Sequence, residues 1–541
     1  MRRRTGAHSR SEHGARRRRR APFVLLAVVV AVGGSGGGLA TGDRAIAHAG
    51  LATGDRAIVR AALAHTDVVT ISSTPLGNPV PGAFVGISLE YGSVFSAELP
   101  GRGGTDRVLA QLIRNLSPGY APIIRIGGDS GDKTWWPIAG MPRPRGINFA
   151  LTPAWLADAR ALARSAHARL ILGINLEANS TAIASIEARH LVAGVGRRNI
   201  AALEIGNEPE LYAGIPWYVT RAGQKGFGRP LTYNLAEYMK EFAKIAGALP
   251  PVPLAGPSTG ADAWIAGLGP LLAANPSLRL ATFHAYALDP KGNAFRGHDC
   301  STAIGEPAHP SIGALLDSYA SQNLVKGALP YVAIAHSHGI PFRIDEMNAI
   351  TCAGAPGVSN TAASALWVLD ELFRLVRAGV DGVNIHTWRG SAGKLFDMHY
   401  RHGRWVGSVK PEYYGLLMFV QAAPPGSRLL STKGASAGPL RSWAVQAPDH
   451  SVRVVLINDG LRHPRWVLVR PPVPSRRATL ERLEAPSAHA RKGVTLSGQS
   501  FSRQTTTGRL AGSRDVTLLQ PQDGDYTVRV PPASAVTLTI R

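Results

Sequence analysis

The sequence predicts an α/β protein, a (β/α)8 TIM barrel with a C-terminal all-β sandwich domain. From residue 84 onward, short apolar runs alternate with amphipathic segments of helical length, which is typical of βαβ units and a parallel sheet. Eight such runs fall within about 300 residues, and this number favours a closed barrel. After about Val420 the chain changes to short β-prone runs separated by Gly, Pro, Asp and Asn, which is typical of a sandwich.

The expected elements follow from these patterns. Barrel strands are expected over 84–90, 122–127, 170–176, 202–207, 252–256, 280–286, 342–346 and 382–387, and helices over 105–116, 153–168, 235–248, 310–319 and 363–378. Sandwich strands are expected over 440–446, 451–458, 465–470, 478–483 and 536–540, and the strand-like run 67–72 could pair with them. A doubly wound open sheet is the alternative to a barrel. No G-x-G-x-x-G follows the first run, which argues against a dinucleotide-binding fold.

The N-terminus has the pattern of an export signal. Nine Arg and one Glu occupy residues 1–20, a 12-residue apolar run follows over 21–32, and Ala47-His48-Ala49 is a plausible cleavage site. A membrane anchor is the alternative, although a span needs about 20 apolar residues. The sequence LATGDRAI occurs at 39–46 and again at 51–58, which is too few copies for a solenoid. We expect an export signal and leader over 1–50 and, over 51–82, the rest of the repeat and an N-terminal strand.

Charge and cysteine content narrow the class of protein. The formal net charge of +23 favours anionic partners, which include nucleic acid, a membrane surface or an acidic glycan. No basic run interleaved with aromatic residues follows the leader, so we expect no nucleic-acid partner. The chain has two cysteines, Cys300 and Cys352, and in an exported protein such a pair suggests one disulfide. Two free buried thiols are the alternative.

Two glutamates stand out. Glu208 lies in the segment Leu-Glu-Ile-Gly-Asn-Glu-Pro (203–209), and Glu346 lies in Phe-Arg-Ile-Asp-Glu-Met-Asn (342–348). Each follows or ends an apolar run, the fourth and the seventh, so each is expected where a barrel strand meets its exit loop. Two carboxyl groups brought together at a barrel mouth are what glycoside hydrolysis needs. Solvated loop glutamates are the alternative.

These residues resemble the retaining hydrolases with glutamates on barrel strands four and seven, and among them glycoside hydrolase family 79, the β-glucuronidases and heparanases. The resemblance covers roughly residues 66–541. Its more specific signal is the stretch Cys-Ala-Gly-Ala-Pro-Gly at 352–357, which is similar to a Gly-rich loop that holds the sugar carboxylate through backbone N–H groups in heparanase-like enzymes. Cys352 and Ala353 stand where heparanases have Gly, and Gly354 follows them.

The resemblance implies a role for each site residue. Glu208 would be the general acid/base and Glu346 the nucleophile. Asn207 would bind the sugar 2-hydroxyl, and its alternative role is to cap the strand end. Tyr286 would donate a hydrogen bond to the nucleophile, and its alternative is packing in the core. Arg125 would lie beneath the nucleophile, and its alternative is a structural ion pair. The remaining expected contacts to the sugar are Glu90, Gly128, Asp129, Ala353, Gly354, His284 and Trp388, of which His284 and Trp388 have packing roles as alternatives.

The expected protein is therefore a secreted or cell-surface retaining hydrolase that cleaves terminal β-linked glucuronic acid from glycans or glycosides. Its barrel would span 83–418 and its sandwich 419–541. A neutral-sugar hydrolase and an inactive carbohydrate-binding protein are the alternatives. We expect no cofactor and no metal, because His399, His402 and Asp397 lack ligand spacing. The expected partner is a carbohydrate, an acidic glycan or glucuronide, and no stable membrane span is expected in the mature chain.

Overall fold

The computed structural model describes residues 66–94, 106–294, 310–434 and 438–541. The export signal, the leader repeat and Cys300 lie outside the described residues. No helix in the described ranges is long and apolar enough to cross a membrane.

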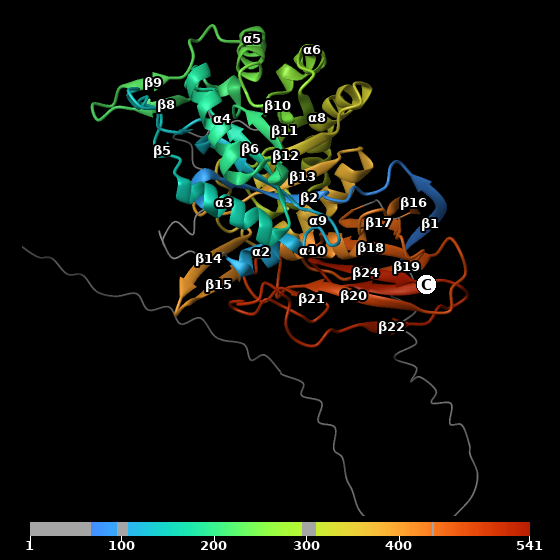
Figure 1. Ribbon diagram of the computed structural model, residues 1–541. Coiled ribbons are helices and arrows are strands. Elements are labelled where there is room, and N and C mark those ends of the chain that lie inside the picture. The colour runs from blue at the N-terminus through green and yellow to red at the C-terminus, as the bar shows by residue number, and fades with distance from the viewer. Residues whose placement is uncertain (1–65, 95–105, 295–309, 435–437) are drawn as a thin grey trace, which may run out of the picture. The chain divides into compact units, whose positions relative to one another are not determined.

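Eight parallel strands form the closed barrel that the sequence predicts (Figure 1). The neighbour order around the barrel is β10-β11-β12-β13-β2-β3-β6-β7, so the open-sheet alternative is wrong. In chain order the strands are β2 (Val85–Glu90), β3 (Ile123–Gly127), β6 (Arg169–Ile174), β7 (Ile200–Ile205), β10 (Leu254–Thr259), β11 (Leu278–Leu288), β12 (Phe342–Ile350) and β13 (Gly382–His386).

Three barrel strands end later than predicted: β10, which continues to Thr259, β11 and β12. Glu346 was expected to end its strand, but β12 continues to Ile350, and β11 likewise continues to Leu288. The two strands stay paired to their ends, where Leu288 lies opposite Ile350, so main-chain hydrogen bonding extends them together. Glu346 therefore projects from within a strand.

Helices connect the barrel strands, and their ends follow local sequence signals. The helices are α2 (Arg107–Arg114), α3 (Pro153–Ala166), α4 (Thr181–Val195), α5 (Leu235–Ala246), α6 (Leu268–Ala274), α7 (Ile312–Leu316), α8 (Ser318–Ser337), α9 (Ala362–Arg377) and α10 (Pro411–Ala422). Thr152 caps α3 by accepting a hydrogen bond from the Trp155 N–H, and Pro153 occupies its first turn. The helix expected over 310–319 is split, because Asp317 adopts an extended conformation and caps α8.

The C-terminal β-domain is a ten-stranded mixed sheet around its own apolar core. Its strands are β1 (Asp67–Leu76), β16 (Arg428–Gly434), β17 (Leu440–Gln446), β18 (Val452–Asn458), β19 (Arg465–Arg470), β20 (Ala478–Glu484), β21 (Thr495–Leu496), β22 (Thr517–Leu519), β23 (Tyr526–Val530) and β24 (Ser534–Ile540). The N-terminal strand β1 joins this sheet, antiparallel to β16 and parallel to β19.

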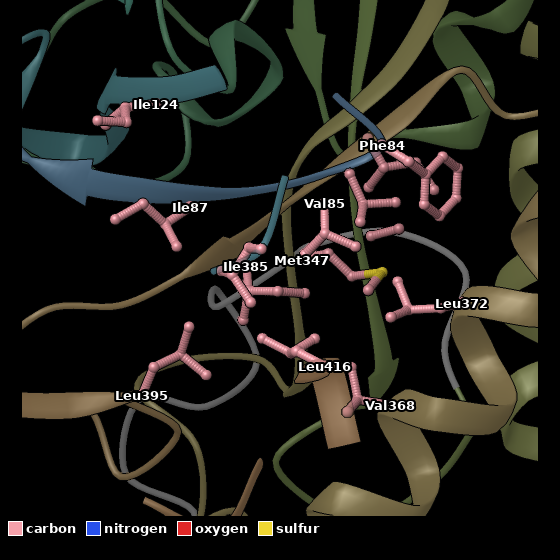
Figure 2. Close-up of a cluster of buried hydrophobic side chains, with 14 of the residues drawn as sticks. Phe84, Val85, Ile87, Ile124, Met347, Val368, Leu372, Ile385, Leu395 and Leu416 are labelled. Atoms are coloured by element: carbon pink, nitrogen blue, oxygen red, sulfur yellow. The ribbon is translucent and has the colours of Figure 1, made fainter. Parts of the chain in front are cut away.

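A shared apolar core links the barrel to the helices α9 and α10. Figure 2 shows Val85 and Met347 from the barrel beside Val368 and Leu372 of α9 and Leu416 of α10. Helix α10 contacts α9 and also strands β18 and β20 of the β-domain. Burial of these side chains fixes the barrel strands, and thereby the side chains at the barrel mouth.

Candidate active site

The two glutamates predicted to act together lie close to one another in the barrel. Glu208 follows β7, Glu346 lies on β12, and both side chains are buried. Glu208 adopts a left-handed conformation with φ 47°, which is rare for a residue other than glycine, and its N–H donates to the Ser258 carbonyl. A carboxylate oxygen of each glutamate and a ring nitrogen of His284 all lie within 4.8 Å of one another. Such proximity of two buried carboxyls is typical of a retaining glycosidase pair.

Both carboxylate oxygens of Glu346 accept hydrogen bonds. Tyr286 donates its hydroxyl to Oε1 at 2.7 Å, and Arg125 donates from Nη1 to Oε2 at 2.5 Å. Burial and the nearby Glu346 charge raise the pKa of Tyr286 well above its usual range, so the phenol keeps its proton and remains a donor. Donors of this kind favour the ionised carboxylate. The structure therefore brings Tyr286 and Arg125 into hydrogen-bonding contact with Glu346.

Arg125 is completely buried among carboxylates. Its Nε donates to Glu204 at 2.6 Å and lies 3.6 Å from Asp345. Burial lowers the pKa of the guanidinium, but Glu204, Asp345 and Glu346 outweigh burial and hold the pKa well above its usual range. Burial and Glu204 raise the pKa of Asp345 well above its usual range. One guanidinium thus lies among the carboxyl groups of Glu204, Asp345 and Glu346.

Sequence reasoning missed Glu204 and Asp345. Each lies inside a strand predicted to be apolar, and a charged residue in such a run was the available signal.

Glu208 lies next to His284. The Nδ1 of His284 lies 2.9 Å from its Oε1, and the Nε2 of His284 lies 3.0 Å from the Ser258 hydroxyl. Glu208, His284 and Glu346 form a geometry that a metal ion could use. Tyr286 and Arg125 already donate to both oxygens of Glu346, however, which fits a charge-balanced carboxylate better than a metal ligand.

The expected sugar-binding residues at the ends of β2, β3 and β7 are neighbours in the structure. Asn207 accepts from Arg125 at 2.8 Å and donates to Asp129 at 3.3 Å. The Asp129 side chain is 73% exposed and so is available to a ligand. Gly128 has φ +65°, and a Cβ there would collide with the Glu90 carboxylate. A glycine is therefore required where the chain passes Glu90.

His386, at the end of β13, is a further site residue that sequence reasoning missed. Its Nε2 lies 3.4 Å from Glu90, and its Nδ1 lies 3.8 Å from Glu346 and 3.2 Å from the Ser88 hydroxyl. Burial lowers the pKa of His386, but Glu346 and Glu90 more than offset burial, so the pKa is raised. Its place at the end of the eighth strand was the available signal.

The loop that was compared with the carboxylate-binding loop of heparanases has an unusual backbone. Cys352, Ala353 and Gly354 follow one another with φ 56°, 72° and 74°. The Gly354 N–H donates to the Thr351 carbonyl, whereas the Ala353 N–H has no hydrogen-bond partner within the described part of the chain. The Ala353 carbonyl accepts from the Ala392 N–H at 2.7 Å, which ties the loop to the segment after β13. Trp388 lies in that segment and is half-buried.

A pocket opens beside Glu208. It is lined by Asp129, Asp132, Lys133, Glu177, Asn207, Glu208, Leu211, Tyr212, Ile215, Pro216 and Trp217. Asp132 holds its wall together, because its carboxylate accepts from the Leu176, Glu177 and Asn207 N–H groups and from the Tyr212 hydroxyl. Sequence reasoning found Asp129, Asn207 and Glu208 of this set and missed the others, which lie in loops without a recognisable motif.

Comparison with known proteins agrees with the fold and with a glycoside hydrolase. Residues 442–537 match the Glycosyl hydrolase family 79 C-terminal beta domain. A β-glucuronidase of Aspergillus niger is 23% identical over 520 residues, which cover 85% of this chain and 91% of that protein. A β-glucuronidase of Neurospora crassa is 23% identical over 452 residues, which cover 72% of this chain and 74% of that protein.

Solved structures share the fold. A 4-O-α-L-rhamnosyl-β-D-glucuronidase from Fusarium oxysporum 12S, in complex with Rha-GlcA, has a TM-score of 0.66 at 18% identity and covers 87% of this chain and 100% of its own. A family 51 arabinofuranosidase from Xanthomonas axonopodis pv. citri has a TM-score of 0.58 at 15% identity, over 88% of this chain and 100% of its own.

The barrel, the paired glutamates and these relatives define a TIM-barrel glycoside hydrolase. Within that class, residues 442–537 match the C-terminal β-domain of glycoside hydrolase family 79, and the chain is similar over most of its length to fungal β-glucuronidases.

Proposed function

We propose that the protein is a retaining β-glucuronidase that releases terminal β-linked glucuronic acid. The observation that carries the mechanism is the pair of buried glutamates, whose carboxylate oxygens lie within 4.8 Å of each other across the barrel. Retaining enzymes need two carboxyl groups about 5–5.5 Å apart, whereas inverting enzymes need a wider gap for a water molecule. The names of the fungal relatives support the choice of sugar.

The division of labour follows from the surroundings of each glutamate. Glu346, held ionised by Tyr286 and Arg125, attacks the anomeric carbon and forms a glycosyl–enzyme bond. Glu208 gives its proton to the departing oxygen, and then takes a proton from the water that hydrolyses the glycosyl–enzyme bond. The Asn207 amide, next to both Arg125 and Asp129, is placed to bind the sugar 2-hydroxyl.

The loop after β12 is the candidate site for the uronate carboxylate. The Ala353 N–H is a donor with no hydrogen-bond partner among the described residues, and it lies in a run of three residues, 352–354, with positive φ. Turns of this kind can present backbone N–H groups to an anion. N–H donors to an anion are charge-assisted and stronger than those to a neutral group. A glucoside would leave such donors unpaired, so we expect at least about 10²-fold discrimination in kcat/KM.

The decisive experiment compares hydrolysis of a chromogenic β-glucuronide with that of the matched β-glucoside. Glu346→Ala serves as the control for contaminating activity. A preference for the glucuronide supports the proposal. Comparable kcat/KM values on the two substrates would indicate that the substrate is a neutral sugar. Binding without turnover would indicate an inactive carbohydrate-binding protein.

The N-terminal sequence pattern supports export of the protein. Secretion of the full chain from a host cell would test this.

A further inference from the structure

The pocket beside Glu208 extends away from the nucleophile. It is lined by Glu208 and Asn207, and neither Glu346 nor Tyr286 contributes to it. Its walls come from the segment after β3, which holds Asp129 and Lys133, from Glu177 after β6, and from the segment after β7 as far as Trp217. If Glu208 protonates the departing oxygen, as proposed above, this pocket lies on the side of the leaving group.

Glu177 is the buried polar group that points to a ligand. The residue is only 8% exposed and lines the pocket, yet its carboxyl group has no hydrogen bond or ion pair with any residue in the described ranges. Its backbone is fixed on both sides, because its N–H donates to Asp132 at 3.1 Å and its carbonyl accepts from Arg229 at 2.8 Å. A rigidly held polar group that faces a cavity without a partner is suited to binding a ligand.

Burial and the neighbouring Asp132 raise the pKa of Glu177 to about 9. At neutral pH the group is therefore a neutral carboxylic acid, which can both donate and accept one hydrogen bond. The hydroxyl groups of a sugar need such mixed donor and acceptor partners.

Trp217 supplies an apolar surface in the same pocket. It lies on β8 (Pro216–Val219), which forms a hairpin with β9 (Lys225–Phe227) (Figure 1). The indole N–H donates to the Asp132 carbonyl at 3.0 Å, and a Cβ on Gly146 would collide with the ring. The ring is thus fixed in place, and a fixed aromatic ring is suited to contact with the C–H face of a sugar.

The pocket offers little positive charge to an anionic ligand. Lys133 is the one cation among its lining residues, beside the carboxyl groups of Asp129, Asp132 and Glu177. Lys133 also lies 4.0 Å from Asp129, so part of its charge is already balanced. A sulfate or carboxylate group would lose its hydration here without gaining a full counter-charge.

We propose that this pocket is a second sugar subsite that binds an uncharged pyranose of the leaving group, with Glu177 and Trp217 as its specificity-determining residues. The inference rests on the proposed function, because Glu208 must face the departing oxygen.

The test measures kcat/KM on three β-glucuronides: a nitrophenyl glucuronide, a disaccharide whose leaving group is a neutral pyranose, and the same disaccharide with a sulfate on that pyranose. The neutral disaccharide should be cleaved at least about 10-fold better than the sulfated one. In Glu177→Ala and in Trp217→Ala, the ratio of neutral-disaccharide to nitrophenyl activity should fall about 10-fold. Glu177→Gln, which keeps a neutral hydrogen-bonding group, should lose less than about 3-fold in that ratio.

Glu237→Ala, at an exposed position on α5, is the matched control and should leave the ratio unchanged. Thermal unfolding shows whether each variant folds. If Glu177→Ala does not fold, Trp217→Ala still tests the subsite, because the Trp217 side chain is half-exposed. An unchanged ratio in the folded variants, or equal cleavage of the sulfated and neutral disaccharides, would overturn the subsite. Cleavage of the nitrophenyl glucuronide but of neither disaccharide would also overturn it, whereas cleavage of no glucuronide would reject the proposed function itself.

Discussion

Arg125 Nη1 lies 2.5 Å from Glu346 Oε2, and the two residues come from strands 221 positions apart in the chain. The same guanidinium donates to Glu204 and to Asn207, the residue before Glu208. Arg125 therefore links the strands that carry the two glutamates. Because the guanidinium is planar and has five donors, it can hold several acceptors at fixed angles.

The two glutamates should differ in their response to mutation. Glu346→Ala should abolish turnover, because no other group in the proposed mechanism can form the glycosyl–enzyme bond. Glu208→Ala should retain slow activity on substrates with good leaving groups, and azide should restore the rate while a β-glycosyl azide forms. Steady-state kinetics and product analysis check both outcomes. Full activity of Glu208→Ala on a poor leaving group would show that the assignment is wrong.

Loss of Arg125 should be costly for stability as well as for catalysis. Arg125→Met leaves Glu204 and Glu346 buried without their cation, and breaking a buried ion pair in this way costs about 3–5 kcal/mol in the free energy of unfolding. Denaturant unfolding measures the change. Arg470→Met removes a surface pair to Asp525 and should cost about 1 kcal/mol or less. Equal effects of the two variants would contradict a charge-balancing role for Arg125.

His386 should make stability depend on pH. Glu346 and Glu90 raise its pKa despite burial, so the folded state favours the charged imidazole. Its contribution to stability is fully present below the unfolded histidine pKa of about 6.5, and it is lost as the pH rises through the raised folded value. His386→Asn should therefore destabilise the protein more at about pH 5 than at about pH 9.

Denaturant unfolding at several pH values measures this difference. His463→Asn, at an exposed position in the β-domain, should show no such trend. A destabilisation by His386→Asn that is constant with pH would reject the electrostatic role.

The predicted disulfide would join Cys352 to Cys300. Cys352 lies in the loop proposed to hold the substrate carboxylate, so the bond would restrain that loop. A closed loop of about 50 residues stabilises by roughly 4 kcal/mol in the chain-entropy model. Peptide mass mapping under non-reducing conditions should find the linked pair. Two free thiols would rule the bond out and would leave the loop restrained only by contacts such as that between Ala353 and Ala392.

Trp443 should be important for the packing of the β-domain strand β17 against α9. Its ring stacks on Phe373 at 5.5 Å between ring centroids, and its indole N–H donates to Asp370 at 2.7 Å. Trp443→Ala removes both contacts and should lower the free energy of unfolding by about 3 kcal/mol. Trp466→Ala, at an exposed position on β19, should cost about 0.5 kcal/mol. Similar losses in both variants would contradict this account.

The sequence by itself determined the barrel, the β-domain and the places of the two glutamates in it, whereas the family resemblance pointed to the residues around them. The strands could be predicted because a parallel strand buried on both faces is an apolar run, and each expected barrel strand is present. Glu208 and Glu346 stood out because a polar residue at the end of such a run faces the barrel mouth. The exact strand ends could not be predicted, because pairing with a neighbour, as between Leu288 and Ile350, sets where a strand stops.

Only the tertiary structure decided how the site is balanced electrostatically. In the sequence, Glu204, Asp345 and His386 have no feature that assigns them to the site. In the closed barrel, Glu204 and Asp345 lie within about 4 Å of Arg125. His386 lies within about 4 Å of Glu90 and Glu346. The pocket with Glu177 and Trp217 is likewise built from three loops with no shared motif. The spacing of apolar residues along the sequence indicates which face of a helix or strand is buried. Distances between side chains on different elements depend instead on how the barrel closes.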